Sequence, residues 1–232
     1  MKAISIQEFG DPSVCVVGDV PPPQPGPGEA TVKIVYAGVN FIDVYMRNGT
    51  YARSHTYQTP LPMVIGMEGA GVVDAVGDGV TDIKPGARVA FCLSRGAYAD
   101  AVAVPAWKLV PVPDAVPFDI AAALMLQGCT AHYLSHSAFP LKSGQSCLIH
   151  AGAGGVGQLL TQLAKKAGAT VFTTVSTEAK AEIARKRGAD HCILYRNEDF
   201  EQEIQRLTDG KGVHVVYDSV GKDTIMKSIR SV

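Results

Sequence analysis

The sequence predicts an α/β protein with a β-rich N-terminal domain (1–122) and a doubly wound parallel sheet after it (123–232). Two observations lead to this prediction. Up to about Pro117, glycine and proline turns separate short runs of β-branched residues, which is typical of β-structure broken by turns. Beyond Pro117, apolar strand-like segments alternate with amphipathic helix-like segments at the spacing of parallel βα units. A chain of 232 residues is long enough for two such domains.

The N-terminal half predicts a small barrel-like β domain. Segment 21–28 (PPPQPGPG) can form neither a helix nor a central strand, so we interpret it as a stiff loop, with a proline-rich recognition motif as the alternative. The alternating, β-branched run 30–39 predicts a strand. Residues 66–80 predict two short β runs separated by glycines, and residues 84–92 predict a Pro-Gly turn that leads into a strand.

The C-terminal half predicts a parallel sheet with right-handed connections. A helix is expected first, over residues 119–137. The strands expected after it are 146–150, 170–175, 191–195 and 213–219. The helices expected between and after these strands are 156–167, 178–187, 198–208 and one that begins near residue 223.

Composition and charge exclude several classes of protein. The chain is 47% hydrophobic and 19% charged, which is enough apolar material for a core and excludes general disorder. A net charge of −1 gives no bulk electrostatic reason to bind nucleic acid or an anionic membrane, and no apolar stretch is long enough to span a bilayer. The N-terminal residues lack the apolar core of a signal peptide. Five scattered cysteines indicate neither a disulfide framework nor a metal site, so we expect a cytoplasmic protein.

A glycine-rich turn is the strongest single motif. Residues 152–157 read Gly-Ala-Gly-Gly-Val-Gly, which fits G-x-G-x-x-G between a predicted strand and a predicted helix. Glycines there permit a tight turn, close approach of the backbone to a pyrophosphate and close packing of the helix on the strand, while the helix N-terminus offers N–H groups to the anion. The alternative is an ordinary glycine-rich turn. A triphosphate-binding loop is disfavoured because no Gly-Lys-Ser/Thr follows the glycines.

The end of the next strand favours NADP over NAD. An NAD enzyme usually carries Asp or Glu there, about 20 residues after the glycines. Here residues 173–177 (TTVST) are uncharged, and Lys180 and Arg196 are the nearby cations. Hydroxyls and cations suit a 2′-phosphate. Glu178 keeps NAD open, although we expect it in the first turn of the following helix, where a carboxylate suits the helix dipole.

Two other patterns are interpreted as structural. His132 and His136 stand four residues apart on an expected helix, but no Glu lies between them, so they do not form an H-E-x-x-H metal site. The basic runs 165–166 and 185–187 lie near predicted helix C-termini, which favours solvated partners of the helix dipole over a nucleic-acid surface.

Five segments together resemble one protein family over essentially the whole chain. They are 38–45 (GVNFIDVY) with Arg47 and Tyr51 after it, 66–71 (GMEGAG), 126–131 (LQGCTA), 150–157 (HAGAGGVG) and 216–221 (VYDSVG). The sequence resembles the zinc-independent, zeta-crystallin-like quinone oxidoreductases of the medium-chain dehydrogenase/reductase superfamily. The resemblance implies a GroES-like catalytic domain beside a Rossmann domain, with NADPH in the cleft between them. It also implies reduction of quinones or related enones by hydride or electron transfer.

The same resemblance implies roles for individual residues. Asn40 would hydrogen-bond near the nicotinamide, and Tyr45 and Tyr51 would line the substrate pocket, so these three are the expected catalytic residues. The expected cofactor-binding residues are Asn40, Gln127 and Thr130 near the nicotinamide, its ribose and the phosphates, Gly152, Gly154, Gly155, Val156 and Gly157 at the pyrophosphate, Ser176, Lys180 and Tyr195 at the 2′-phosphate, and Ser219 beside the cofactor. Some family members carry Lys at the position of Gln127.

No metal is expected. Related zinc alcohol dehydrogenases have Cys at the position of Asn40 and His at the position of Met67, and an amide and a thioether are poor replacements as zinc ligands. The four-cysteine lobe that holds a structural zinc is missing as well, since only Cys92 lies between Arg88 and Ala99. A quinone accepts hydride without a Lewis acid, given positioning and hydrogen bonds to the developing oxyanion.

The expected partner is a small quinone or enone, with no membrane and no nucleic acid, and the resemblance implies a homodimer for the full-length protein. A doubly wound sheet of this kind has about six strands. The segments above give four, with the fourth at an edge, so we expect a chain truncated at its C-terminus. The alternatives to quinone reduction are an NADPH-dependent enone or alkenal reductase and a non-enzymatic NADPH- or RNA-binding role.

Overall fold

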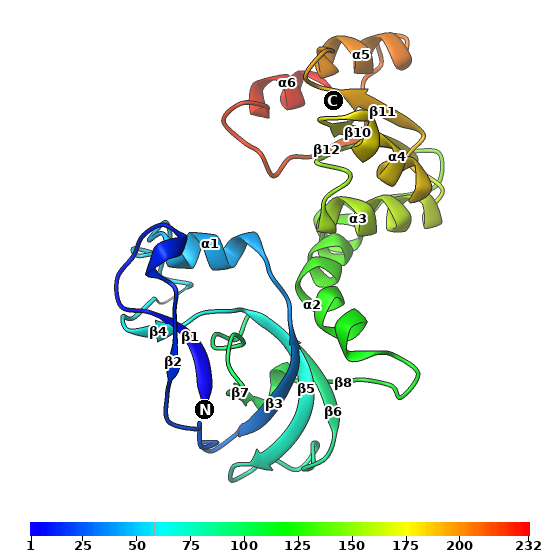
Figure 1. The fold of residues 1–232 in the computed structure, drawn as a ribbon. Coiled ribbons are helices and arrows are strands. Elements are labelled where there is room, and N and C mark those ends of the chain that lie inside the picture. Colours follow the sequence, from blue (N-terminus) through cyan, green and yellow to red (C-terminus); the bar gives the residue numbers. More distant parts are fainter. Residues whose placement is uncertain (58) are drawn as a thin grey trace. The chain divides into compact units, whose positions relative to one another are not determined.

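Two compact units make up the protein. The computed structural model describes residues 1–57 and 59–232 (Figure 1). The first unit comprises Met1–Leu126 and the second comprises Gln127–Val232. The division lies inside helix α2 (Phe118–His132), which therefore contributes residues to both units.

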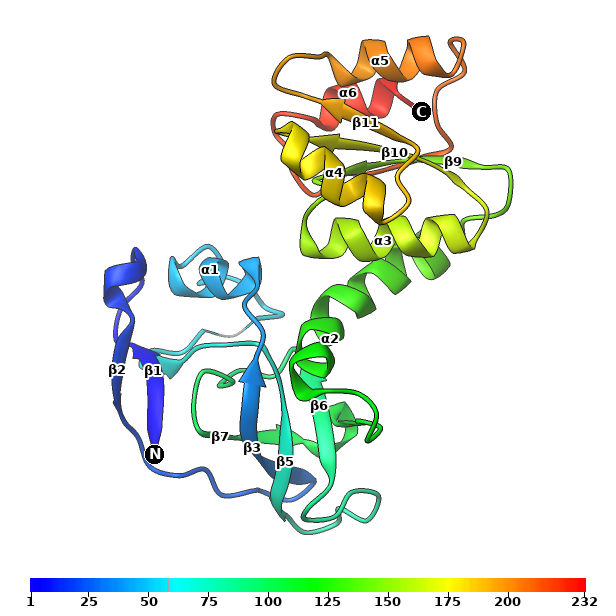
Figure 2. The same cartoon turned by 45° about the vertical axis from the view of Figure 1, so that its right-hand side comes forward.

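A five-stranded antiparallel sheet organises the first unit, which is β-rich as the sequence predicted. Its strand order is β7-β3-β5-β6-β8, and Figure 2 shows β3, β5 and β6 side by side. The strands are β3 (Glu29–Ala37), β5 (Glu68–Val76), β6 (Arg88–Cys92), β7 (Ala101–Pro105) and β8 (Val110–Pro111). Inward-facing side chains form one core that includes Val32, Val73 and Phe91. Segment 21–28 contains neither helix nor strand, which confirms the loop interpretation.

Residues 66–80 form one strand where the sequence predicted two. Strand β5 runs without a break for nine residues and includes Gly69 and Gly71. A Cβ on Gly71 would lie 1.9 Å from the Lys33 carbonyl oxygen on β3. The register between β3 and β5 also shifts between Ile34 and Tyr36. Glycine inside this strand therefore serves the close approach of two backbones at a bulge and does not form a turn.

A second, smaller sheet completes the first unit and was not predicted. Its strand order is β2-β1-β4, and its strands are β1 (Lys2–Ile6), β2 (Val16–Asp19) and β4 (Met63–Val64). The short helices of this unit are η1 (Pro12–Val14), α1 (Phe41–Arg47) and η2 (Ala106–Lys108). Met46 of α1 packs with Ile6 and Met63 in a separate apolar cluster. Helix α1 begins directly after Asn40, so the motif 38–45 spans a strand exit and a helix start.

A parallel sheet with helices on both faces forms the second unit, which confirms the predicted fold class. The strand order is β11-β10-β9-β12, with β9 (Ser146–His150), β10 (Thr170–Val175), β11 (His191–Leu194) and β12 (Val215–Tyr217). The helices are α3 (Gly155–Lys166), α4 (Glu178–Lys186), α5 (Phe200–Leu207) and α6 (Ile225–Arg230). Cys147 and Ile149 face a core with α3 and α4, while Leu148 faces Phe200 and Ile204 of α5. As predicted, the fourth strand lies at an edge of this sheet.

Helix α2 ends earlier than the sequence predicted. The α-helix ends at His132 and continues as a π-helical segment, η3 (Tyr133–Ala138). The Ser135 hydroxyl donates to the Ala131 carbonyl at 2.8 Å, so a side chain competes for an acceptor of the last α-helical turn. The rings of His132 and His136 stack with centroids 4.1 Å apart. Within residues 1–57 and 59–232, no group of three or more His, Cys, Asp or Glu side chains is arranged to hold a metal ion.

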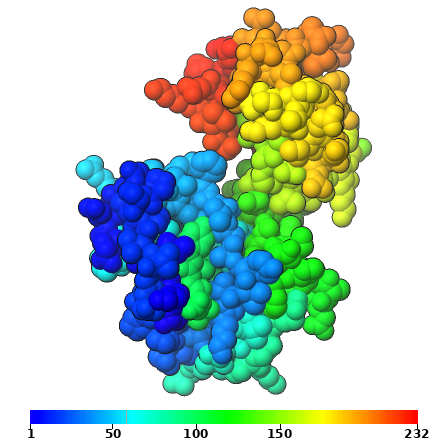
Figure 3. Space-filling view, in the orientation of Figure 1, coloured from blue at the N-terminus to red at the C-terminus, as the bar shows by residue number. Residues whose placement is uncertain are grey.

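The surface of the second unit carries apolar side chains at α6. Ile225, Met226 and Ile229 are exposed, and the red and orange-red atoms of this region stand out at the surface in Figure 3. In the part of the chain that the structure describes, no helix has the length and apolar character needed to cross a membrane.

Leu148→Ala should destabilise the second unit, because Leu148 has no exposed surface and packs between the sheet and α5. We expect a loss of about 2–5 kcal/mol in the free energy of unfolding, measured by urea denaturation. Ile183→Ala on α4 is the matched control, since this side chain is 41% exposed. Equal losses for the two variants would contradict the assignment of this core.

Candidate functional site

The glycine-rich turn connects β9 to α3 at the carboxyl edge of the parallel sheet. Ala151 adopts a left-handed conformation (φ 54°), and its carbonyl accepts the Gly154 N–H at 2.8 Å, which closes the turn. Gly154 is the N-cap of α3, and no side chain of the described residues caps this helix N-terminus. The first N–H groups of α3 and the positive end of the helix dipole therefore point beyond Gly154.

Two glycines of the turn are required by close packing. A Cβ on Gly152 would lie 1.8 Å from Thr173 Oγ1, and a Cβ on Gly157 would lie 2.4 Å from the Ala151 carbonyl oxygen. Any larger residue would push the helix away from the sheet. These contacts are the close helix–strand packing that the motif requires.

Gln127 lies against the same turn. A Cβ on Gly155 would lie 1.9 Å from Gln127 Oε1, so the Gln127 side chain occupies the space that a side chain at residue 155 would need. Thr130 follows one helical turn further along α2. The structure therefore brings Gln127 to the glycine-rich turn.

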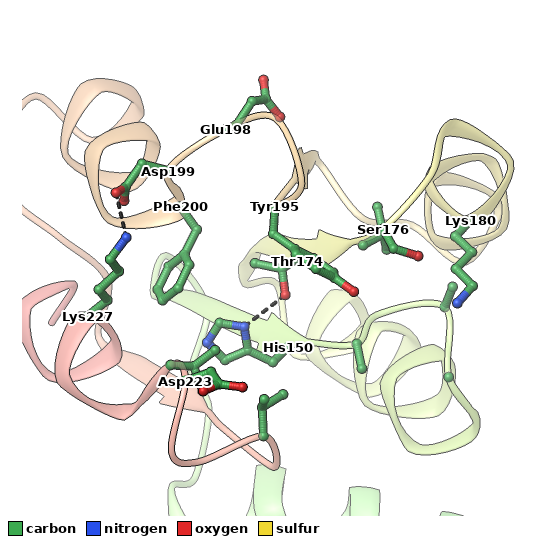
Figure 4. A pocket seen from close by; sticks show the side chains of 16 residues that line it. His150, Thr174, Ser176, Lys180, Tyr195, Glu198, Asp199, Phe200, Asp223 and Lys227 are labelled. Carbon is green, nitrogen blue, oxygen red and sulfur yellow. Dashed lines mark hydrogen bonds and ion pairs between the residues drawn. The ribbon is translucent and has the colours of Figure 1, made fainter.

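A cavity of about 500 Å³ opens beside this turn, within the second unit. Doubly wound sheets bind their ligands at this edge. Four predicted cofactor residues line the cavity: Gly154, Ser176, Lys180 and Tyr195. In Figure 4, Ser176 and Lys180 lie at one end, and Tyr195 lies between them and the far wall. Gly152 and Gly155 are direct neighbours of lining residues in the turn, and Val156 and Gly157 follow in the first turn of α3. Ser219 directly precedes the lining residue Val220.

The Lys180 end of the cavity suits an anion. Thr177 is the N-cap of α4, and its hydroxyl accepts the Lys180 backbone N–H at 3.3 Å. Glu178, the residue that kept NAD open, accepts a hydrogen bond from Arg185 of the same helix and does not line the cavity. A hydroxyl from Ser176 and an ammonium group from Lys180 therefore reach the cavity without that carboxylate, which favours a phosphate.

At the far end of the cavity, the lysine side chain is paired with a carboxylate. Lys227 Nζ donates to Asp199 Oδ2 at 2.6 Å (Figure 4), and this contact lowers the pKa of Asp199. Glu198 and Asp223 also line this end. Because acidic groups outnumber cations among these four residues, an anionic ligand group is better accommodated at the Lys180 end.

The sequence did not identify a buried hydrogen-bond network in the cavity wall. His150, the last residue of β9, is 4% exposed. Its Nδ1 shares a hydrogen bond with Thr174 Oγ1 at 2.8 Å (Figure 4), and its Nε2 shares one with Ser228 Oγ at 3.0 Å. Ser228 donates in turn to Asp218 Oδ2 at 2.7 Å. The signal was present, since His150, Thr174 and Asp218 all lie at the carboxyl ends of neighbouring parallel strands.

Burial and hydrogen bonding fix the charges of this network. Burial lowers the pKa of His150, and the Asp218 carboxylate, 3.8 Å from Nε2, opposes that shift only in part. Burial alone would raise the pKa of Asp218, but hydrogen bonds from the Gly221 N–H and the Ser228 hydroxyl help to lower it to about 2. The imidazole is therefore neutral and the carboxylate ionised at neutral pH.

The two predicted tyrosines lie together in the first unit. The rings of Tyr45 and Tyr51 meet edge to face with centroids 5.5 Å apart, and Tyr57 stacks on Tyr51 at 5.0 Å. Phe41 extends the row, 6.2 Å from Tyr45. Burial and the neighbouring tyrosines raise the pKa of Tyr51, so its phenol keeps its proton at neutral pH. The row offers flat aromatic surface together with hydroxyl donors.

Asn40 is buried and held through both its backbone and its side chain. The Asn40 N–H donates to Asp43 Oδ2 at 2.9 Å, and Asn40 Nδ2 donates to Glu68 Oε2 at 2.7 Å. Met67 is buried in an apolar cluster with Ile6. The two positions that carry zinc ligands in related alcohol dehydrogenases thus hold a hydrogen-bonded amide and a packed thioether, which are not the donors that zinc prefers.

Comparison with known proteins supports the fold of both units. Residues 26–114 match the alcohol dehydrogenase GroES-like domain, and residues 155–232 match the family described as zinc-binding dehydrogenase. A quinone oxidoreductase from Pseudomonas aeruginosa is 43% identical over 232 residues, covering 100% of this chain and 70% of that protein. The crystal structure of Escherichia coli quinone oxidoreductase complexed with NADPH superimposes with a TM-score of 0.95 at 39% identity, covering 100% of this chain and 70% of that one. The chain belongs to the quinone oxidoreductase family of medium-chain dehydrogenases.

Other members of the quinone oxidoreductase family match equally broadly. A 2-haloacrylate reductase from Burkholderia sp is 45% identical, covering 99% of this chain and 69% of that protein. This quinone oxidoreductase homologue thus spans about 70% of the length of these relatives. The GroES-like and Rossmann-like parts predicted from the sequence are confirmed.

The second unit of this quinone oxidoreductase homologue fits a dinucleotide phosphate. The N-terminus of α3 is without a side-chain cap, and the nearest atom to a Cβ built on Gly154 is the Ala151 carbonyl oxygen at 3.1 Å. A helix N-terminus at the cavity wall suits a pyrophosphate, and Gln127 lies beside it at Gly155. Ser176 and Lys180 supply donors for a further phosphate at the other side of the cavity.

His150→Gln should flatten the decline of stability in mild acid. An unfolded histidine has a pKa of about 6.5. The folded value is lower, so as the pH falls below the unfolded value, the unfolded state binds a proton that the folded state does not, and stability is lost. We expect the wild type to lose up to about 1.4 kcal/mol per pH unit from this residue, and the variant to lack that component, in urea denaturation between pH 5 and 8. His55→Gln is the exposed control, and an unchanged slope in His150→Gln would overturn the assignment.

Proposed function

We propose that this protein reduces quinones with NADPH and without zinc. The observation that carries the proposal is the cavity at the carboxyl edge of the parallel sheet, with an uncapped helix N-terminus at Gly154 and the side chains of Ser176, Lys180 and Tyr195 in its lining. The similarity to an NADPH-bound family member from Escherichia coli supports the choice of cofactor. A reducing cytoplasm is the proposed setting, since the five scattered cysteines indicate no disulfide framework.

The second unit would bind the cofactor, which supplies a hydride when bound. The N–H groups at the start of α3, from Gly155 and Val156, would hold the pyrophosphate, because a helix N-terminus favours anions. Lys180 would hold the 2′-phosphate with the hydroxyls of Ser176 and Tyr195. Glu178 would not compete for that position, since its carboxylate pairs with Arg185.

The first unit would orient the acceptor. Tyr45 and Tyr51 would stack against a flat quinone and donate a hydrogen bond to the oxygen on which negative charge develops. The raised pKa of Tyr51 keeps this donor protonated. Asn40, whose Nδ2 is bonded to Glu68, would place its amide beside the nicotinamide. Such positioning suits quinone reduction, which needs no Lewis acid to polarise the substrate.

A second candidate is the reduction of an activated alkene. The 45% identity to a 2-haloacrylate reductase favours it, because that relative acts on a carbon–carbon double bond conjugated to a carboxyl group. The same cofactor cavity would serve both reactions. The two candidates differ in the acceptor that the aromatic row of the first unit would receive, so parallel assays with a quinone and with a haloacrylate separate them.

Oxidation of NADPH with a small naphthoquinone tests the proposal directly. We expect turnover that prefers NADPH to NADH and is unaffected by a metal chelator. Lys180→Gln should raise the Kd for NADPH by about 10- to 100-fold, as expected when one charged hydrogen bond is lost. The Kd for NADH should stay within about threefold of the wild-type value. Lys166→Gln, at the exposed end of α3, is the matched control. NADPH binding without turnover on any acceptor would favour a non-enzymatic role, and equal use of NADH would contradict the 2′-phosphate site.

Tyr51→Phe tests the acceptor side. Removing the hydroxyl should lower kcat by about 10- to 100-fold, because one donor to the developing oxyanion is lost. NADPH affinity, measured by fluorescence, should not change, since the cofactor cavity lies in the second unit. Tyr36→Phe is the control, a 51% exposed tyrosine on β3. An unchanged kcat in Tyr51→Phe would remove this residue from the proposed mechanism.

A further inference from the structure

Glu68 is a completely buried carboxylate in the first unit. It begins strand β5 inside the segment 66–71, and its side chain has no exposed surface. Burial raises its pKa, while hydrogen bonds from the Leu126 N–H and the Asn40 amide oppose that shift. Neither of these two partners carries a charge. A buried carboxylate with uncharged partners costs free energy, so its presence calls for a reason other than stability.

The two oxygens of Glu68 hold two different elements. Oε2 accepts from Asn40 Nδ2 at 2.7 Å, and Oε1 accepts from the backbone N–H of Leu126 on α2. The next residue after Leu126 is Gln127, whose side chain lies against Gly155 of the glycine-rich turn. The Glu68 side chain therefore holds Asn40 and also Leu126, the residue immediately before Gln127. Both Asn40 and Gln127 are expected near the nicotinamide.

The absence of a side chain at Gly38 leaves space for the Glu68 carboxylate. A Cβ on Gly38 would lie 1.9 Å from Glu68 Oε2, and the Gly38 N–H donates to the Glu68 carbonyl at 3.0 Å. The Asn40 backbone is fixed as well, through the Asp43 carboxylate, which also accepts from the Tyr98 hydroxyl at 2.9 Å. In the capping box of α1 the Asn40 side chain also accepts from the Asp43 N–H, so this N–H and Glu68 together orient the amide.

Glu68 sets which end of the Asn40 amide faces it. A carboxylate can only accept, so Nδ2 of Asn40 faces Glu68, which leaves Oδ1 to accept from the Asp43 N–H. A glutamine at residue 68 offers one acceptor and one donor. If its oxygen keeps the Leu126 N–H, its amino group faces Asn40 Nδ2. The Asn40 amide must then either turn around and lose the Asp43 N–H or keep two amino groups facing each other.

We infer that Glu68 is the positioning residue that sets the orientation of the Asn40 amide, and with it the side of that amide presented to the bound nicotinamide. This inference rests on the proposed role of Asn40 in NADPH-dependent reduction. Glu68 touches neither cofactor nor acceptor and acts through Asn40.

Four proteins test the inference: the wild type, Glu68→Gln, Asn40→Asp and the double variant. In Glu68→Gln we expect kcat to fall by at least about tenfold while KM changes little, because the orientation matters in the transition state. NADPH affinity should stay within about threefold, since the phosphate-binding residues lie in the second unit. Asn40→Asp should lower the Tm by several degrees by placing two carboxylates together. In the double variant the introduced carboxylate at position 40 accepts from the introduced amide at position 68, so the Tm should recover while kcat stays low. Glu8→Gln is the exposed control.

The two measurements separate the possible failures. Wild-type kcat in Glu68→Gln, or recovery of kcat together with the Tm in the double variant, would overturn the positioning role and leave Glu68 purely structural. Additive Tm changes in the double variant would show that Glu68 does not fix Asn40. Absence of quinone turnover in the wild type would refute the proposed function by itself, while the Tm comparison would still decide whether the two side chains are coupled.

Discussion

The second unit depends on how closely helix α3 approaches strand β9. The approach is possible only because residues 152 and 157 have no Cβ, and the available space is taken by Thr173 Oγ1 and the Ala151 carbonyl oxygen. Helix and strand meet backbone to backbone at this point. As a result the N-terminus of α3 lies at the wall of the cavity, and the ends of β10 and β11 bring Ser176 and Tyr195 to the same space. The anion-binding role that we propose for the cavity thus depends on this packing.

Hydrogen bonds hold buried polar groups in both units, and the groups differ in charge. In the second unit a neutral imidazole is held among hydroxyls, with an ionised carboxylate one hydroxyl away. In the first unit a carboxylate is held by an amide and a backbone N–H. In each case the hydrogen-bond acceptors and donors can be satisfied in one arrangement, which makes the geometry specific. The polar interiors of this protein therefore determine orientation more than they add stability.

The sequence predicted the elements that depend on local residue spacing. It did not predict the features that depend on contacts between residues far apart in the chain. The alternation of βα segments and the chemistry of the glycine-rich turn gave the second unit almost element by element. The sheet formed by β1, β2 and β4 was missed because its strands are short and far apart in the chain. Gly69 and Gly71 looked like turn residues, since a turn and a close backbone approach both select glycine. The contacts of His150 and Glu68 were missed, because each involves partners at least 24 residues away.

Helix α6 has only six residues, yet it forms part of the cavity wall. It is tied to α5 by the contacts of Lys227 with Asp199 and of Arg230 with Glu201, and Ser228 reaches the imidazole beneath the cavity. Fraying of this helix would break all three connections at once and hydrate His150. A ligand that binds only the closed cavity raises the free energy of that local opening by mass action. Occupancy of the cavity and protection of the α6 amides from hydrogen exchange therefore both report the equilibrium between the closed and the opened α6.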